Sequence, residues 1–179
     1  TVQKYTNALS WTSSTPANNA ALKYGTSYTA TVTPATNGGT NGAITYSSGT
    51  TATMTINSST GAITVAKADG STSVITASMA RTATVKAAST TRTFKTQKGD
   101  CKLSVTNGSM TTGGTMALSG RISASSTGTK TYAIKTNGTT SASSISNGTL
   151  TAGAMSSAND TAQSVVVTIT DPGDSQFNG

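Results

Sequence analysis

Polar and apolar residues alternate with a period of two along much of the chain, and no stretch has helical periodicity. The clearest alternating stretches are residues 28–32, 53–57 and 62–65. Period-two alternation is typical of a strand with one buried face, and the β-branched residues in these stretches suit a pleated surface. The chain is therefore expected to be all-β. Further strands are expected at residues 43–46, 73–77, 82–87, 92–96, 102–106, 115–122, 130–135, 149–152 and 164–170.

Turn-forming dipeptides separate these stretches. Four of the Asn-Gly pairs in the chain are Asn41-Gly42, Asn107-Gly108, Asn137-Gly138 and Asn147-Gly148. Asn and Gly tolerate the positive φ that tight hairpins need. Short strands with a turn signal every ~8–12 residues indicate a sandwich or a barrel.

Internal similarity favours two domains in the 179 residues. Residues 43–48, 56–64 and 73–77 are echoed, more weakly, by residues 130–134, 145–151 and 164–168. A second echo joins residues 94–100 to residues 169–174, and each carries Gly-Asp where a domain would end. Immunoglobulin-like sandwiches have ~100 residues. Two tandem immunoglobulin-like β-sandwich domains are therefore predicted, at residues 1–98 and 99–179.

One part of the first half carries a family resemblance. Its strands and turns read Thr-Tyr-Ser-Ser, then Ser-Thr-Gly-Ala-Ile-Thr-Val, then Thr-Ser-Val-Ile-Thr-Ala. This pattern resembles the bacterial immunoglobulin-like repeat of invasin- and intimin-type adhesins, which also occurs in tailed-phage virion proteins. The resemblance implies a sandwich with a spacer, display or adhesion role and no catalysis. The matching residues are Tyr46, Ser47, Ser48, Ser59, Thr60, Gly61, Ile63, Val65, Val74, Ile75 and Thr76.

The side chains that carry most enzyme chemistry are scarce. Histidine and glutamate are absent and there are five aspartates, which excludes Ser-His-Asp and Cys-His nucleophiles and disfavours a glycosidase pair. A lysine-activated serine stays open. Asp171 and Asp174 could contribute two calcium ligands, but no Asp-rich loop surrounds them, and a turn at Pro172-Gly173, which explains the segment without a metal, is favoured. The chain is expected to be non-enzymatic, with no cofactor and no metal.

Charge and the few aromatic residues suggest partner contacts. The net charge of +7 favours acidic partners such as anionic surface glycans, or it only keeps a basic surface soluble. The basic residues form no dense run, so nucleic-acid binding is not expected. Cys101 is the single cysteine and is expected to be a small buried hydrophobe. No apolar stretch approaches the ~20 residues that cross a bilayer. The candidate contacts are Trp11, Arg92, Lys95, Lys98 and Lys102.

Together these features predict a structural or display protein of an extracellular assembly. The first interpretation is a phage virion component: a capsid decoration, tail or fibre-associated protein whose partners are other subunits. The alternatives are a stalk segment of a bacterial surface adhesin or filament, and a carbohydrate-binding module that uses Trp11 or the Asn-Gly loops. Contacts are expected through edge strands, with residues 92–96 and the terminal stretches as candidates.

Overall fold

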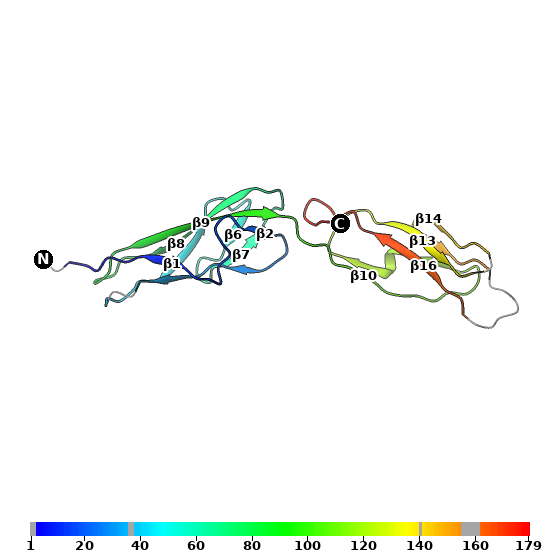
Figure 1. Ribbon diagram of the computed structural model, residues 1–179, viewed down its shortest axis with the longest axis horizontal. Helices are drawn as coiled ribbons and strands as arrows, with labels where there is room; N and C mark the ends of the chain where they lie inside the picture. Colours follow the sequence, from blue (N-terminus) through cyan, green and yellow to red (C-terminus); the bar gives the residue numbers. More distant parts are fainter. Residues whose placement is uncertain (1–2, 36–37, 140, 155–161) are drawn as a thin grey trace. The chain divides into compact units, whose positions relative to one another are not determined.

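The computed structural model describes residues 3–35, 38–139, 141–154 and 162–179 (Figure 1). These residues form sixteen strands and one short 3-10 helix, η1 (Ser119–Arg121). The expectation of an all-β chain is confirmed, and no helix in the described ranges is long and apolar enough to span a membrane. The chain divides into two compact units, unit 1 (Thr1–Asp100) and unit 2 (Cys101–Gly179). The expected division lies two residues before this one.

Unit 1 contains three sheets. Their strand orders are β2-β9-β8-β5, β3-β7-β6 and β1-β4, and every pairing is antiparallel except that of β2 with β9. The strands are β1 (Leu9–Trp11), β2 (Ala21–Lys23), β3 (Tyr28–Thr29), β4 (Val32–Pro34), β5 (Ile44–Ser48), β6 (Met54–Ile56), β7 (Ala62–Val65), β8 (Thr72–Met79) and β9 (Ala88–Gln97).

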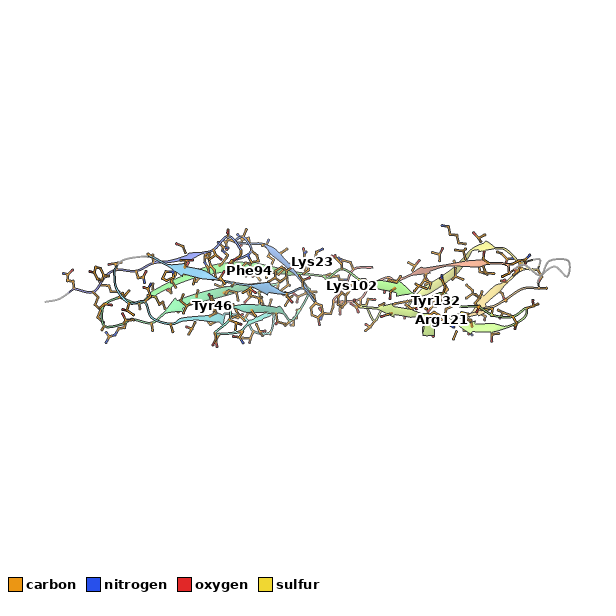
Figure 2. All side chains as sticks on the ribbon, turned by 90° about the horizontal axis from the view of Figure 1, so that it is seen from below. Lys23, Tyr46, Phe94, Lys102, Arg121 and Tyr132 are labelled. Atoms are coloured by element: carbon orange, nitrogen blue, oxygen red, sulfur yellow. The ribbon has the colours of Figure 1, made fainter. Side chains whose placement is uncertain are left out.

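A continuous core lies between these sheets. Alternate residues of β8 are buried, as its sequence alternation predicts. Phe94 of β9 is fully buried, and Figure 2 shows where its side chain and that of Tyr46 lie in unit 1. The buried side chains come from all three sheets, as in a sandwich. They are Leu9, Leu22, Ala30, Val32, Tyr46, Met54, Ile63, Val65, Ile75, Ala77, Met79, Val85 and Phe94.

Unit 2 also contains three sheets. Their strand orders are β10-β12, β11-β15-β14 and β13-β16, and all pairings are antiparallel. The register of β13 with β16 shifts between Ile134 and Thr136. The strands are β10 (Leu103–Val105), β11 (Thr115–Ala117), β12 (Ile122–Ala124), β13 (Thr131–Asn137), β14 (Ser144–Ser146), β15 (Thr149–Thr151) and β16 (Val165–Thr170).

The Asn-Gly pairs do not all close hairpins. Asn147 and Gly148 have φ of 47° and 73° and connect β14 to β15, as a two-residue hairpin requires. Of the other three, Asn137-Gly138 ends β13, and Asn41-Gly42 and Asn107-Gly108 lie in loops. An Asn-Gly pair therefore marks a chain reversal only where both flanking strands can pair.

Three expected strands and one expected sheet edge differ in the structure. Residues 28–32 divide into β3 and β4, which belong to different sheets, and residues 115–122 divide into β11, η1 and the start of β12. Residues 82–87 form a turn between β8 and β9, because the Val85 amide donates to the Thr82 hydroxyl oxygen at 3.0 Å and the Thr82 amide donates to the Val85 carbonyl at 2.9 Å. Residues 92–96, expected at a sheet edge, lie inside the four-stranded sheet, since β9 is flanked by β8 and β2. The edges of that sheet are β5 and β2.

Candidate binding site

The same sheet arrangements occur in both units. The pair β1-β4 corresponds to β10-β12, the triplet β3-β7-β6 to β11-β15-β14, and the pair β5-β8 to β13-β16. In unit 1 the last pair continues through β9 to β2. In the described part of unit 2, β16 pairs with no strand besides β13. One edge of β16 is therefore open where its counterpart, β8, is covered.

The pairing registers align the two units residue by residue. Tyr46 lies opposite Ala77 in unit 1, and Tyr132 lies opposite Ile169 in unit 2. Ala77 is therefore the counterpart of Ile169. Ala77 is fully buried, whereas Ile169 is half-buried. Val165 and Ile169 are larger than their counterparts Ser73 and Ala77, and Val167 is smaller than Ile75, yet all three inward residues of β16 are less completely covered.

A cleft of about 540 Å³ lies along β16. Its other walls are β15, β11 and residues 105–112 after β10. In unit 1 the counterpart position is filled, because β9 packs against both β8 and β1. The cleft thus occupies the place that β9 takes in unit 1. The apolar side chains that line it include Met116, Leu118, Leu150, Val165, Val167 and Ile169.

Arg121 is the one charged residue in the described lining of the cleft. It is half-buried, follows Gly120 in η1 and is labelled in Figure 2. A Cβ at Gly108 would lie 2.4 Å from Met116 Cε and 3.2 Å from Arg121 Cζ. Gly108 thus lets the backbone lie close to the side chains of Met116 and Arg121, and it does not form part of a hairpin turn.

A buried polar cluster stands apart from the apolar cleft. The Asp171 carboxylate lies 3.0 Å from Lys130 Nζ and accepts hydrogen bonds from the Ser126 hydroxyl at 2.6 Å, the Gly173 amide at 2.9 Å and the Cys101 thiol at 3.1 Å. The Ser126 hydrogen bond is the largest cause that lowers the pKa of Asp171 well below its usual range. The site therefore holds a carboxylate, not a carboxylic acid.

This cluster also contains a Ser–Lys contact. Lys130 Nζ donates to Ser126 Oγ at 3.2 Å and to the carbonyl oxygens of Ser126 and Gly128, each at 2.8 Å. The described contacts of Lys130 are thus the ion pair with Asp171 and hydrogen bonds to nearby oxygens. Cys101 is half-exposed and bonded to Asp171, so its expected role as a buried hydrophobe is wrong.

Asp174 organises the last turn of the chain. Its carboxylate accepts hydrogen bonds from the backbone amides of Thr127 at 2.7 Å and of Gln176 and Phe177 at 2.8 Å. The Thr127 amide is the largest cause that lowers the pKa of Asp174. Gly173 has φ of 75° in the same turn. In the described ranges no three His, Cys, Asp or Glu side chains form a group that could hold a metal ion.

The structure brings together two of the five predicted contact residues. The Arg92 guanidinium lies 5.4 Å from the centre of the Trp11 ring and donates to the carbonyl oxygens of Thr15 at 3.1 Å and Pro16 at 2.6 Å. Trp11 Nε1 donates to the Thr91 carbonyl at 3.2 Å. Both side chains are half-buried, so the pair fixes the N-terminal segment onto β9.

The remaining predicted contacts do not join that pair. Lys95 is exposed on the opposite face of β9 from Phe94, since it has the other parity along the strand. Lys98 is exposed after β9, and Lys102 is exposed in unit 2. The cleft residues were missed because half-buried valines on a strand are indistinguishable, in sequence, from core residues.

Comparisons with protein families and with curated proteins found no match to the chain. The resemblance to bacterial immunoglobulin-like repeats therefore stays a prediction. Its residues occupy β5 to β8, where Tyr46 and Ile75 are buried in the core of unit 1.

Proposed function

We propose that the chain is a non-enzymatic structural or display protein of an extracellular assembly, built from two tandem immunoglobulin-like β-sandwich domains. The assembly we favour is a phage virion, in which the chain is a capsid decoration, tail or fibre-associated component. The supporting observation is the recurrence of three sheet arrangements in both units, with one edge left open in the second. A repeated sheet unit with an open edge suits attachment to other subunits.

The polar side chains of the structure support an architectural role. Lys130, which contacts the Ser126 hydroxyl, forms an ion pair with Asp171. Asp174 is occupied by backbone amides. Arg92 covers one face of Trp11, which leaves that ring poorly placed to stack on a sugar. Ion pairs, hydrogen bonds and a cation–ring contact within the turns and strands account for these side chains.

An adhesin stalk uses the same modules, so location separates the two proposals. Gold-labelled antibodies against the chain, imaged by electron microscopy on the native source, are expected to decorate virus particles at regular positions. Label along the bacterial envelope would replace the virion with the adhesin. Label on neither structure, with the purified chain showing no affinity for particles or cells, would contradict a role in assembly.

A further inference from the structure

We propose that Asn107 is a site of spontaneous deamidation in the folded chain, and that its conversion to aspartate and isoaspartate lowers the stability of unit 2. The Gly108 amide nitrogen gives its proton to a base in solution and bonds to Asn107 Cγ, and the Cγ–Nδ2 bond breaks with release of ammonia. Water then opens the five-membered ring. Attack at Cγ gives aspartate, and attack at the backbone carbonyl carbon of Asn107 gives isoaspartate. One water is consumed and one ammonia leaves for each asparagine.

The residue after Asn107 is the type that lets this ring close most easily. Glycine has no Cβ, so its backbone can approach the preceding side chain without a clash. The same dipeptide occurs at Asn41, Asn137 and Asn147, and the residue before each of the four asparagines is Thr or Ser. The local sequences are therefore nearly alike, and the structure around each pair has to separate their rates.

Hydrogen bonds restrain Asn137 on both sides of the reacting atoms. Its Oδ1 accepts from the Thr139 hydroxyl at 2.6 Å and from the Ser143 amide at 3.3 Å. The Gly138 amide donates to the Ser164 carbonyl at 3.0 Å. Ring closure has to break these contacts first, because the attacking nitrogen and the attacked side chain are both engaged.

The next two pairs are also restrained, to different degrees. Asn147-Gly148 connects β14 to β15 in a hairpin, and ring closure requires a rotation at the asparagine that the paired strands resist. Asn41 has one restraint of the side chain, since its Oδ1 accepts from Asn7 Nδ2 at 2.7 Å. We expect Asn41 to react more slowly than Asn107 and faster than the other two.

Asn107 has none of these restraints. Asn107 and Gly108 are exposed and lie outside the strands. Within the part of the chain that the structure describes, neither the Asn107 side chain nor the Gly108 amide forms a hydrogen bond. The backbone contact that precedes them is that of the Thr106 amide, which donates to the Arg121 carbonyl at 2.9 Å. The pair is thus free to reach the geometry of attack without local unfolding.

The exposure of Asn107 does not depend on the open edge of β16. Strands β1 and β10 are equivalent and of equal length, and Asn107 lies two residues after Val105 as Ser13 lies two residues after Trp11. Ser13 is exposed although β9 is present in unit 1. A strand beside β16 would therefore leave Asn107 exposed.

Deamidation changes how this segment packs on unit 2. A Cβ at Gly108 would lie 2.4 Å from Met116 Cε and 3.2 Å from Arg121 Cζ, so the backbone itself lies against both side chains. Isoaspartate adds one carbon to the backbone between residue 107 and Gly108, which displaces Gly108 from this position. The lost packing is expected to destabilise unit 2.

The test follows the conversion of each asparagine in the full chain. One sample is incubated folded and one in urea, in the same mildly alkaline buffer. Trypsin cleaves after Lys102 and Arg121, and the peptide 103–121 contains Asn107 as its one asparagine. Mass spectrometry with chromatographic separation of the aspartate and isoaspartate forms gives the rates. In the folded chain Asn107 is expected to convert at least about fivefold faster than Asn137 and Asn147, since a hydrogen bond that must break lowers the reactive population by about that factor.

The unfolded sample is the internal control. In urea the four rates are expected to become nearly equal, and the rate at Asn107 is expected to be nearly the same folded and unfolded. Conversion of folded Asn137 or Asn147 as fast as that of Asn107 would overturn the site. Conversion of Asn107 severalfold slower in the folded chain than in urea would overturn it as well.

Asn107→Gln tests the effect on unit 2, because glutamine closes the corresponding ring much more slowly. Thiol labelling of Cys101 in urea is compared before and after ageing. The aged unaltered chain is expected to be labelled at lower urea than the fresh chain, and aged Asn107→Gln is expected to match its fresh sample. A midpoint that ageing leaves unchanged, or shifts equally in both chains, would overturn the effect on stability.

Discussion

Unit 1 and unit 2 share three sheet arrangements, yet only unit 1 has a continuous buried core. In unit 2 the described hydrophobic residues that are buried are Leu118 and Leu150. The second unit does not lack apolar residues, because β16 alone contributes Val165, Val167 and Ile169. In the described residues of unit 2, no counterpart of β9 lies beside β16. The difference teaches that one covering strand, rather than apolar content, completes the core.

Unit 2 compensates with polar contacts. The ion pair of Lys130 and Asp171 ties β13 to the segment after β16, with Ser126 and Cys101 bonded to the same carboxylate. Asp174 ties that segment to Thr127. Such contacts are directional and fix geometry, but a single hydrogen bond adds less net stability than the burial of a large side chain. We therefore expect unit 2 to be the less stable unit until its edge is covered.

The largest effect is expected from removing the anchor of β9. Phe94→Ala deletes a fully buried ring and is expected to destabilise unit 1 by about 4 kcal/mol, through lost burial and the cavity left behind. Trp11 is the single tryptophan and lies in unit 1, so its fluorescence during urea unfolding reports that unit. Val166→Ala in unit 2, at an exposed position, is the control and should leave the Trp11 transition unchanged. A small effect of Phe94→Ala would contradict the conclusion that β9 completes the core of unit 1.

The next effect concerns the ion pair of unit 2. Lys130→Met leaves the Asp171 carboxylate without its counter-charge in a site of low exposure, which destabilises the unit because a charge without a partner is unfavourable there. Cys101 is the single cysteine and its thiol is bonded to Asp171, so thiol labelling in urea reports the opening of unit 2. Labelling is expected at lower urea in Lys130→Met than in Lys135→Met, an exposed lysine of β13. Equal midpoints would show that the pair is not structural.

Acid is expected to affect unit 2 more than unit 1. The folded-state pKa values of Asp171 and Asp174 are lowered, chiefly by the Ser126 hydroxyl and the Thr127 amide respectively. A carboxyl whose pKa is lower in the folded state contributes stability above its unfolded value, about 4, and loses that contribution as pH falls toward the folded value. Labelling of Cys101 by a dipyridyl disulfide, a reagent that stays reactive toward thiols in acid, should therefore rise below about pH 4.

The same measurements at other pH values give the control. The chain has no histidine, so the stability of both units is expected to be level between about pH 5 and 8. Asp174→Asn should flatten the acid response of unit 2, since the side chain no longer titrates. Asp69 in unit 1 also has a lowered pKa, chiefly through the Ser71 hydroxyl, so Trp11 fluorescence is expected to respond to acid as well. An acid response of Cys101 that is unchanged in Asp174→Asn would contradict the assignment to these two aspartates.

How much of this could be predicted depends on the length and pairing of each strand. Residues 62–65 and 73–77 alternate strictly and form strands where expected. The short strands β1 and β2 are defined by their pairing with β4 and β9. Pairing between residues that are distant in the sequence leaves no local pattern of polar and apolar residues from which a strand could be predicted. Residues 82–87 alternate as well, but the Thr82 side chain closes a turn.

The candidate site could not be predicted from the alternation of polar and apolar residues, for a related reason. The second internal echo aligned Phe94 with Ile169, yet Phe94 lies on β9 and Ile169 lies on β16, the counterpart of β8. The echo therefore concealed the open edge. A strand without a neighbour has the same alternation as a strand with one, since alternation records which face is apolar and not whether it is covered.

The smallest effect compares two glycines at equivalent positions. Gly61 precedes β7 and Gly148 precedes β15, and their φ values are 72° and 73°. A Cβ at Gly61 would lie 2.0 Å from the Ala30 carbonyl oxygen, whereas a Cβ at Gly148 would lie 3.4 Å from the nearest atom, Tyr132 Cε2. Gly148→Ala is expected to destabilise unit 2 by about 1 kcal/mol, from backbone strain alone. Gly61→Ala adds a clash with backbone in the packed unit and should destabilise unit 1 more. Urea unfolding followed through Trp11 and Cys101 measures both, and equal effects would show that the second unit is as tightly packed as the first.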